Sequence, residues 1–309
     1  MSAPVFLRNN YSDMFGSSAL PVLEEVFRTR FAQFPMQREK LFKTVSTDRD
    51  IWQSTELHDL QLFLEIAEGE DYTYDRQRQG ANKTLNVKKY GLGFSISEEA
   101  VEDGKFEFIA DATGRLAESG AESQEIQGMN IINNGFTTET TADGVALFST
   151  AHLLPRGGTF RNRLSTDADL SVTSFEQMLV DFETQFVGDT GIYKKIMPRL
   201  IWCAPQNKRF AKELIASALK PDTSDNNMNS FQGEVDQVMS SVHFTDTDAW
   251  GLCASQNDAG LRIVRRKAME TKGAGDAEGF HNDSIYYKSR YREIVSAIHP
   301  YGIFGTTGA

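Results

Sequence analysis

Three residues near the middle of the chain carry side chains that together could perform hydrolytic chemistry. Ser149 has a hydroxyl, His152 lies three residues later, and Asp143 lies shortly before both. A serine nucleophile needs a histidine base, an acid that orients this base, and donors that stabilise the oxyanion. The chain has no Gly-x-Ser-x-Gly elbow, and spacing alone shows none of the required geometry. A hydrolase using Ser149 and His152 is therefore kept as an alternative, and we expect His152 to make a structural contact.

Other residue patterns indicate ligand binding more weakly. Asp246 and Asp248 could offer carboxylates to a cation, but capping acids at a turn explain them as well, and no EF-hand spacing follows. The Gly-rich segment 272–279 lacks the pattern that cradles phosphate in P-loops. The histidines are scattered singly, without the spacing of a zinc site. They are His58, His152, His243, His281 and His299. We therefore expect no metal, no cofactor and no catalytic residue.

The composition is that of an ordinary globular protein. Its 309 residues can bury a substantial core without disulfides or metals, in one large domain or in several lobes. The 21 Phe residues against 3 Trp indicate many packed surfaces. A net charge of −11 argues against a general nucleic-acid-coating face, because such binding depends on Lys and Arg that neutralise phosphates. Local basic patches remain compatible with this charge.

The cysteines and the N-terminal residues indicate in which cellular compartment the protein is expected. Cys203 and Cys253 lie in separate apolar runs and form neither a Cys-x-x-Cys pair nor a disulfide framework, which indicates a reduced cytoplasm. The N-terminus has no basic start followed by an apolar segment, and no run approaches the roughly 20 apolar residues of a membrane span. We expect neither a signal peptide nor a membrane-embedded segment.

The candidate residues belong to a turn-rich block, residues 133–164, that follows a long polar helix. Asp143-Gly144 predicts a turn, residues 145–148 a short apolar strand, and Pro155 with the glycines after it a second turn. We expect the helix at about 105–134, a length of roughly 45 Å. One of its faces carries a charged stripe that we interpret as solvated. The stripe consists of Glu107, Asp111, Arg115, Glu118, Glu122 and Glu125.

Before the helix, the sequence predicts an arm and a two-stranded excursion. Residues 1–20 read as an extended arm, and a short helix then ends at Pro35. Residues 43–47, 61–66 and 84–94 alternate like strands. Because an isolated hairpin is marginally stable in water, this excursion needs a partner surface.

After the block, the sequence predicts helices mixed with strands. Ser171 begins a capping pattern into a helix that runs to about residue 186. A second helix is expected at 208–219. The expected strands are 199–204, 235–244, 249–254, 260–264 and 284–298. The predicted fold class is therefore α+β.

Basic residues surround the excursion and predict a basic tip on an acidic protein. They are Arg76, Arg78, Lys83, Lys88 and Lys89. Such a tip would pair with an acidic neighbour, for example the helix stripe. A solvated loop is the alternative interpretation.

Six segments, in a fixed order and covering most of the chain beyond residue 70, carry a resemblance to a known family. They are 90–99 (YGLGFSISEE), 131–152 (IINNGFTTETTADGVALFSTAH), 157–170 (GGTFRNRLSTDADL), 217–229 (SALKPDTSDNNMN), 245–250 (TDTDAW) and 290–305. The chain resembles the tailed-bacteriophage major capsid proteins of the HK97-like fold. The ordered set is far more specific than any single motif, and the first 40 residues match only as an arm.

The resemblance implies an α+β, HK97-like fold with an N-terminal arm, an extended β-hairpin loop, a peripheral domain with a long spine helix, and an axial domain. The implied bounds are 1–40 for the arm and short helix, 41–96 for the extended loop, 97–198 with 265–298 for the peripheral domain, and 199–264 with 299–309 for the axial domain. The spine helix is expected at about 105–134. The loop would lie over a neighbouring subunit, which supplies the partner that the hairpin lacks alone.

The implied function is a major capsid protein that self-assembles through pentamers and hexamers into the icosahedral head of a tailed double-stranded DNA phage. Implied partners are further copies of the chain, a separate scaffold protein, a portal, packaged DNA contacted non-specifically, and optionally a decoration protein. The location would be the virion capsid, assembled in the bacterial host cytoplasm without a membrane. Residues expected at subunit interfaces are Arg76, Arg78, Lys83, Lys88, Lys89, Glu118, Glu122, His152, Arg161 and Arg163.

Two features separate the chain from some relatives. Some carry a long N-terminal scaffolding segment, whereas here the arm begins almost at once, which indicates a separate scaffold protein or an already processed chain. Met1 favours the separate scaffold. Some relatives also form covalent cross-links between loop lysines and asparagines. No motif near Lys83, Lys88 or Lys89 identifies such a cross-link, so none is expected. An encapsulin-like shell of an enzyme compartment shares the fold and is the alternative to a phage head.

Overall fold

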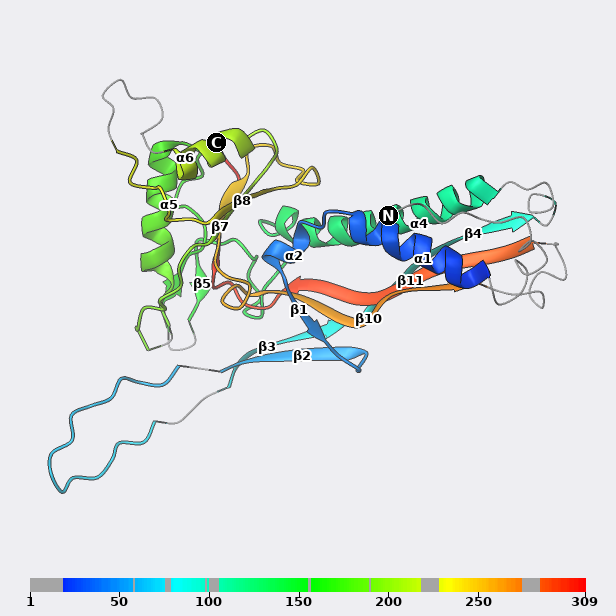
Figure 1. Cartoon of the computed structure of the whole chain (residues 1–309). Helices are drawn as coiled ribbons and strands as arrows, with labels where there is room; N and C mark the ends of the chain where they lie inside the picture. The colour runs from blue at the N-terminus through cyan, green and yellow to red at the C-terminus, as the bar shows by residue number, and fades with distance from the viewer. Residues whose placement is uncertain are drawn as a thin grey trace. The chain divides into compact units, whose positions relative to one another are not determined.

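The computed structural model describes residues 19–57, 59–75, 79–97, 99, 106–154, 157–188, 190–217, 228–273 and 284–309 (Figure 1). The arm before residue 19 lies outside these residues, as do Arg76, Arg78 and Pro155. The chain divides into two compact units. Unit 1 comprises the described parts of 1–36, 87–126 and 265–293, and unit 2 those of 37–86, 127–264 and 294–309.

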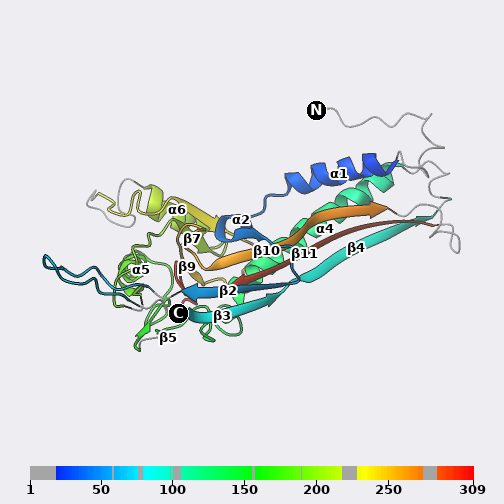
Figure 2. The same ribbon diagram turned by 90° about the horizontal axis from the view of Figure 1, so that it is seen from below.

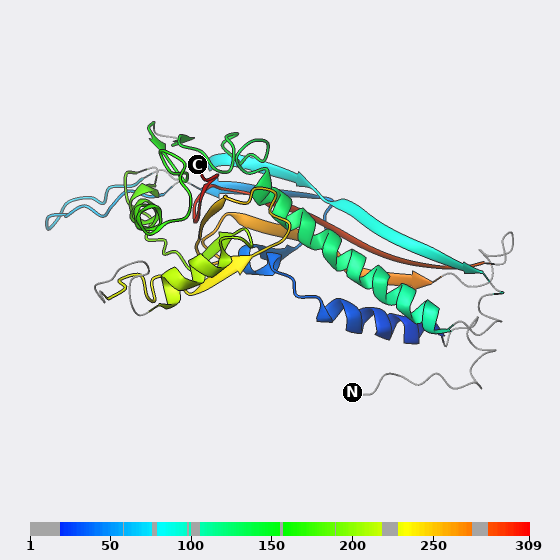
Figure 3. The ribbon, with the colours of Figure 1, turned by 90° about the horizontal axis from the view of Figure 1, so that it is seen from above.

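Unit 1 combines two helices with long strands. Helix α1 (Ala19–Gln33) lies beside the first part of α4 (Phe106–Asn133), as Figure 2 shows. Three strands of one sheet follow in the order β10 (Leu261–Gly273), β11 (Ser284–Ala297) and β4 (Lys88–Ser97). In Figure 3, α4 runs along β4 and β11. The strands β11 and β4 are antiparallel, and β4 is the edge strand.

Helix α4 confirms the expected long helix, and its spacing explains how it packs. Ile109, Leu116 and Ala117 recur at helical intervals and are buried. Leu116 and Ala117 pack with Phe27 of α1 and Tyr287 of β11 in one apolar cluster. This cluster fixes the helix against the sheet.

The charged stripe of α4 is shorter than predicted. Glu107, Asp111 and Glu118 are exposed, but Glu125 is buried. Glu107 and Glu125 are separated by about five full turns, so both should point the same way. The helix is covered over a wider arc toward its C-terminal end, and a sequence pattern does not reveal which other segments cover it.

Unit 2 contains a buried four-stranded sheet in the order β12–β9–β7–β8. Every residue of β7, β9 and β12 is buried. Helices α5 (Val172–Gln185) and α6 (Lys208–Ala216) contact this sheet, and the predicted cap of α5 is confirmed because Ser171 and Ser174 form a capping box. The strands are β7 (Leu200–Cys203), β8 (Gln237–Ser240), β9 (Trp250–Cys253) and β12 (Ile303–Thr306).

The strand β12 has no counterpart in the sequence prediction. Its glycine-rich composition argues against a strand, yet Gly305 pairs with Gly251 of β9. A Cβ at Gly305 would lie 2.9 Å from the Trp202 ring, and one at Gly251 would lie 2.6 Å from it. The glycines therefore make room for the indole, which is information that only the packed sheet contains.

Unit 2 also contains a hairpin and several short elements. Strands β2 (Ile51–Leu57) and β3 (Gln79–Asn86) pair antiparallel, and Trp52 lies opposite Leu85. Strand β1 hydrogen-bonds to β10, whose first residues belong to this unit. The short elements are α2 (Arg38–Leu41), β1 (Lys43–Ser46), β5 (His152–Leu153) and β6 (Thr159–Phe160).

Two predicted strands are wrong. Residues 61–66 alternate like a strand but form no strand pairing in the structure, and the strand lies at 51–57 instead. Residues 145–148 form only an isolated bridge between Thr140 and Ala146. There the backbone N–H groups of Leu147 and Phe148 bond to loop carbonyls at Glu139 and Gly135. Alternation or apolarity marks a segment that can pair or be buried, but a strand forms only where a partner strand lies alongside.

Candidate functional site

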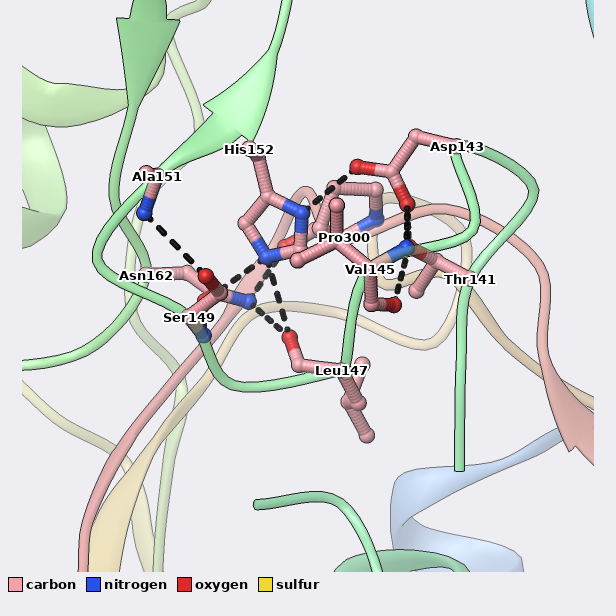
Figure 4. Close-up of polar contacts among 9 residues, drawn as sticks. All are labelled: Thr141, Asp143, Val145, Leu147, Ser149, Ala151, His152, Asn162 and Pro300. Atoms are coloured by element: carbon pink, nitrogen blue, oxygen red, sulfur yellow. Dashed lines mark hydrogen bonds and ion pairs between the residues drawn. The ribbon is translucent and has the colours of Figure 1, made fainter. Parts of the chain in front are cut away.

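The side chain of His152 lies at the centre of a buried polar network (Figure 4). The imidazole Nδ1 lies 2.7 Å from the Asp143 carboxylate. The Nε2 lies 3.1 Å from Oδ1 of Asn162 and 3.3 Å from the carbonyl of Leu147. The ring also stacks on Phe160, with centroids 5.2 Å apart. Each polar edge of the imidazole thus faces the protein interior.

Asp143 begins the network at the turn that the sequence predicts. The backbone N–H of Gly144 donates to Thr141, and φ of Gly144 is 80°, a conformation that glycine adopts without strain. The Asp143 carboxylate accepts hydrogen bonds from the Thr141 hydroxyl and from the N–H of Val145. Burial alone would raise the pKa of Asp143, but its bonds from His152 and Thr141 hold the pKa below its usual value.

Asn162 joins this network to distant parts of unit 2. Its fully buried amide donates to the carbonyls of Leu147 (2.6 Å) and Pro300 (3.2 Å). Its Oδ1 accepts from the N–H of Ser149 at 2.9 Å. The sequence prediction did not include Asn162, because an isolated asparagine in a loop carries no signal that it bridges segments far apart in the chain.

The geometry gives Ser149 no activating base. Its hydroxyl accepts a hydrogen bond from the N–H of Ala151 at 3.1 Å, while both imidazole nitrogens of His152 face other groups. A nucleophilic serine needs its base within hydrogen-bond reach. Within the described ranges, no group of three or more His, Cys, Asp or Glu residues is arranged to hold a metal ion. The network holds a loop in shape.

Burial also bears on the interface role predicted for His152. The side chain is fully buried inside unit 2. This burial does not favour direct contact with another subunit, and the interface role of His152 stays a prediction. The expectation that His152 makes a structural contact agrees with its bonds.

Arg161 and Arg163 lie on either side of Asn162 and are held by acids of their own unit. Arg161 donates to Asp181 of α5 at 2.8 Å. Arg163 pairs with Asp167, and its guanidinium lies 5.2 Å from the centroid of the Phe136 ring. Both side chains are about a quarter exposed, which leaves part of each guanidinium accessible.

The described lysines of the predicted basic tip lie on strands. Lys83, on β3, donates to the Glu139 carboxylate at 3.1 Å and to the carbonyl of Ala297 at 2.8 Å. Lys88 and Lys89 begin β4 and are exposed. Arg76 and Arg78 lie outside the described residues. The lysines are therefore not brought together at a tip.

Glu118 and Glu122 of α4 border a hollow of about 480 Å³ on unit 1. Arg30 and Phe34 line it from the α1 side, with Arg115 on α4. Glu118 is exposed and Glu122 half-buried. Their interface role stays a prediction.

Burial shifts the pKa values of both cysteines and of His299. Burial raises the pKa of the Cys203 thiol to about 11 and that of Cys253 to about 12, so neither is a reactive thiolate at neutral pH. Burial, with the charges of Arg262 and Lys194, lowers the pKa of His299 to about 4. Among the described helices, none is long and apolar enough to span a bilayer.

A model of the phage capsid protein family matches residues 81–305, well over half of the chain. The chain belongs to the phage capsid protein family. No curated protein sequence matches it. Family membership makes this a structural capsid protein rather than an enzyme, and the hydrolase alternative is therefore rejected.

Solved structures with low sequence identity share the fold. A virus-like particle from Pyrococcus furiosus is 11% identical with a TM-score of 0.57, covering 94% of this chain and 99% of its own. The mature capsid of bacteriophage PhiM1 is 13% identical with a TM-score of 0.55, covering 88% and 87%. The procapsid of bacteriophage JBD30 is 12% identical with a TM-score of 0.50, covering 95% and 76%. These likenesses show that the capsid protein has the HK97-like α+β fold, as predicted.

The described part of the loop between β2 and β3 in this capsid protein is acidic. The described part, residues 61–75, contains five acidic residues and no Lys or Arg. Of the basic side chains counted toward the predicted tip, Lys83, Lys88 and Lys89 lie on the flanking strands, and Arg76 and Arg78 lie outside the described residues, so the basic tip stays a prediction. In Figure 1 the light-blue loop extends away from β2 and β3.

The same loop exposes apolar side chains. The Phe63 side chain is fully exposed, and each of the other large apolar side chains named below is at least about one-third exposed. Their alternation gave the strand prediction, and their exposure shows that no partner covers them within the described chain. The exposed set is Leu60, Leu62, Phe63, Leu64, Ile66, Tyr72 and Tyr74.

Proposed function

We propose that this chain is the major capsid protein of a tailed double-stranded DNA bacteriophage, which assembles through pentamers and hexamers into the icosahedral head that encloses the genome. The family match over residues 81–305 carries the proposal. The apolar loop at 61–75 supports it, since a monomeric protein rarely exposes such a row of large side chains. The virion capsid is the location that follows, with assembly in the host cytoplasm.

The domain roles form part of this proposal. Residues 97–198 with 265–298 would form the peripheral domain and residues 199–264 with 299–309 the axial domain, while 41–96 would form the extended loop. The continuous α4 helix and the long β10 and β11 strands support a rigid peripheral domain. The buried β12–β9–β7–β8 sheet supports an axial core, on which α5 of the 97–198 segment also packs.

Further partners are proposed from the family. They are a scaffold protein encoded separately, a portal, packaged DNA contacted non-specifically, and optionally a decoration protein. An encapsulin-like compartment shares this fold, but the phage capsid family match favours a phage head. A portal and a terminase encoded beside this chain would favour the head, and cargo enzymes would favour the compartment.

Electron microscopy of the expressed protein, with and without its scaffold, tests the function. We expect closed icosahedral shells built from pentamers and hexamers. Persistent monomers under all assembly conditions would contradict it. Shells that co-purify with an enclosed enzyme and no portal would favour the compartment.

A further inference from the structure

The neck of the loop between β2 and β3 is closed by a bond between its two ends. The backbone N–H of Gln61 donates to the Asp75 carboxylate at 3.0 Å, across 14 positions of the chain. The residues between these two form no helix or strand, and all of them are exposed. A group that holds the chain just before Gln61 therefore holds the root of the whole loop.

A tight turn after α5 lies at this root. We call the described residues of 186–194 the clamp turn. The N–H of Gly188 donates to the carbonyl of Ile192 at 2.7 Å, and the N–H of Lys194 donates to that of Phe186 at 2.8 Å. The Phe186 side chain is fully buried in an apolar core of unit 2. The clamp turn thus starts from a fixed point and is braced by its own backbone.

The carboxylate of Asp59 lies against the backbone of the clamp turn. A Cβ at Gly188 would lie 2.3 Å from Oδ2 of Asp59, so the glycine leaves the room that the carboxylate occupies. The Lys194 ammonium lies 3.6 Å from the same oxygen. It also lies over the Tyr301 ring, 3.8 Å from the ring centroid. The lysine is therefore positioned from two sides.

A second attachment holds the hairpin itself. Lys83 on β3 donates to Glu139 and to the carbonyl of Ala297, and its side chain is 15% exposed. Lys83 lies opposite Ser54 of β2, whereas Asp59 lies beyond the end of that strand. A hairpin that is held at two places along its length keeps one direction. A change of direction must then begin after Asp59.

We propose that Lys194 is a positioning residue that clamps the root of the loop at Asp59, so that β2 and β3 move with unit 2 and only the residues after Asp59 reorient. A few residues at the end of an element can absorb such a change. The purpose of the clamp rests on the proposed shell function. A loop with a fixed root has fewer orientations to lose when a neighbouring subunit binds it, which favours assembly.

An incidental ion pair is the alternative, since exposed pairs contribute little to stability. Two observations favour a clamp. Gly188 provides space for the Asp59 carboxylate, and the Tyr301 ring holds the ammonium group of Lys194 in place. An incidental pair requires neither contact.

Spin-label distances in the free subunit test the clamp. One label is placed at Lys212→Cys on the exposed surface of α6 and the other at Leu60→Cys, beside Asp59. The native thiols are buried, with pKa values of about 11 and 12, and react slowly with the label. We expect a narrow distance distribution that becomes at least about twice as broad in Lys194→Met. Lys194→Arg should restore the narrow distribution, because a guanidinium also pairs with carboxylates and stacks on aromatic rings.

Two controls separate the clamp from a general loss of order. Lys195→Met changes the exposed neighbour of Lys194 and should leave the distribution narrow. A label at Leu64→Cys in place of Leu60→Cys reports the residues beyond the pivot, and its distribution should be equally broad with and without Lys194. An unchanged Leu60→Cys distribution in Lys194→Met would overturn the clamp, and a narrow Leu64→Cys distribution would overturn the pivot.

A double-mutant cycle tests the contact between Asp59 and the clamp turn. Gly188→Ala should accelerate hydrogen exchange in β2 about three- to tenfold, because the new methyl group displaces the carboxylate. In an Asp59→Ala background the same change should have a smaller effect. The new methyl group also approaches the carbonyl of Ile192 at 3.2 Å, but this contact is the same in both backgrounds. Equal effects in the two backgrounds would contradict the contact.

Shell assembly separates this inference from the proposed function. Lys194→Met should lower the yield of closed shells at least about threefold relative to the native chain and to Lys195→Met, and Lys194→Arg should restore it. Equal yields from Lys194→Met and the native chain would overturn the role of the clamp in assembly. A native chain that forms no shells would count against the shell function, and the spin-label distances would still decide whether the clamp exists.

Discussion

Asn162 links several segments of the turn-rich block through the hydrogen bonds of its side chain. It bonds to the backbone of Ser149, Leu147 and Pro300, and it also contacts the His152 ring. Each buried hydrogen bond contributes about 1 kcal/mol net, but leaving a buried partner unsatisfied costs about 1–3 kcal/mol. The block therefore depends on polar bonds that the surrounding apolar side chains cannot replace.

The Asn162→Ala variant should lower the free energy of unfolding by about 2–4 kcal/mol, since it leaves several buried groups without partners. Urea denaturation of unassembled subunits measures this change. Ser149→Ala is the matched control, because the Ser149 side chain makes one local bond to Ala151, and its effect should stay below about 1 kcal/mol. Equal stability of Asn162→Ala and the native chain would show that the network contributes no stability.

Sequence reasoning reached part of this site. It predicted the Asp143-Gly144 turn and the structural role of His152, because a turn signal and the lack of a catalytic motif are local properties. It did not identify Asn162, whose bond to Pro300 joins residues 138 positions apart. It also did not show that His152 is buried, because an isolated sequence does not reveal which loops fold over a side chain.

Among the elements, those with a strong local period were predicted well. Helix α4 and the capped helix α5 lie close to their expected bounds, since a helix satisfies its backbone within its own segment. Strands need partners, so β12 was missed and residues 61–66 were predicted as a strand although they have none. The signal at 61–66 is still informative, because it marks a segment that requires a partner surface.

Lys83 links three elements of unit 2 and gives a prediction at this scale. Its ammonium group joins β3 to Glu139, after α4, and to Ala297 at the end of β11. Lys83→Met should lower stability by about 1–3 kcal/mol, because the carbonyl groups and Glu139 lose a mostly buried donor. Hydrogen exchange should accelerate in β2 and β3, while β7 and β9 stay protected.

Lys43→Met is the control for this prediction, since Lys43 is an exposed strand lysine of the same unit. It should leave exchange in the hairpin unchanged. Unaltered protection of β2 and β3 in Lys83→Met would mean that the hairpin is held by its apolar contacts, such as Trp52 with Leu85, rather than by the lysine.

For the whole molecule, stability and assembly are coupled. The chain carries a net charge of −11, yet Lys89 of β4 and Lys288 of β11 are exposed on unit 1, and the loop at 61–75 of unit 2 carries five acidic residues beside its exposed apolar side chains. Copies of one sequence can thus attract each other locally although their net charges repel. Any partner that binds only the folded chain shifts the folding equilibrium toward it, so the assembled subunit should be more stable than the free one.

Limited proteolysis measures this coupling at the loop. Chymotrypsin should cut the free subunit first after Phe63, Tyr72 or Tyr74, because these side chains are exposed on backbone outside any described helix or strand. In assembled shells the same cuts should slow by at least about tenfold, since a docked loop must open before the protease can bind it. A variant with all three residues changed to Ser should resist this first cleavage as a free subunit, which assigns the site. Equal cleavage rates in shells and free subunits would show that the loop stays uncovered after assembly, and its apolar side chains would then need another explanation.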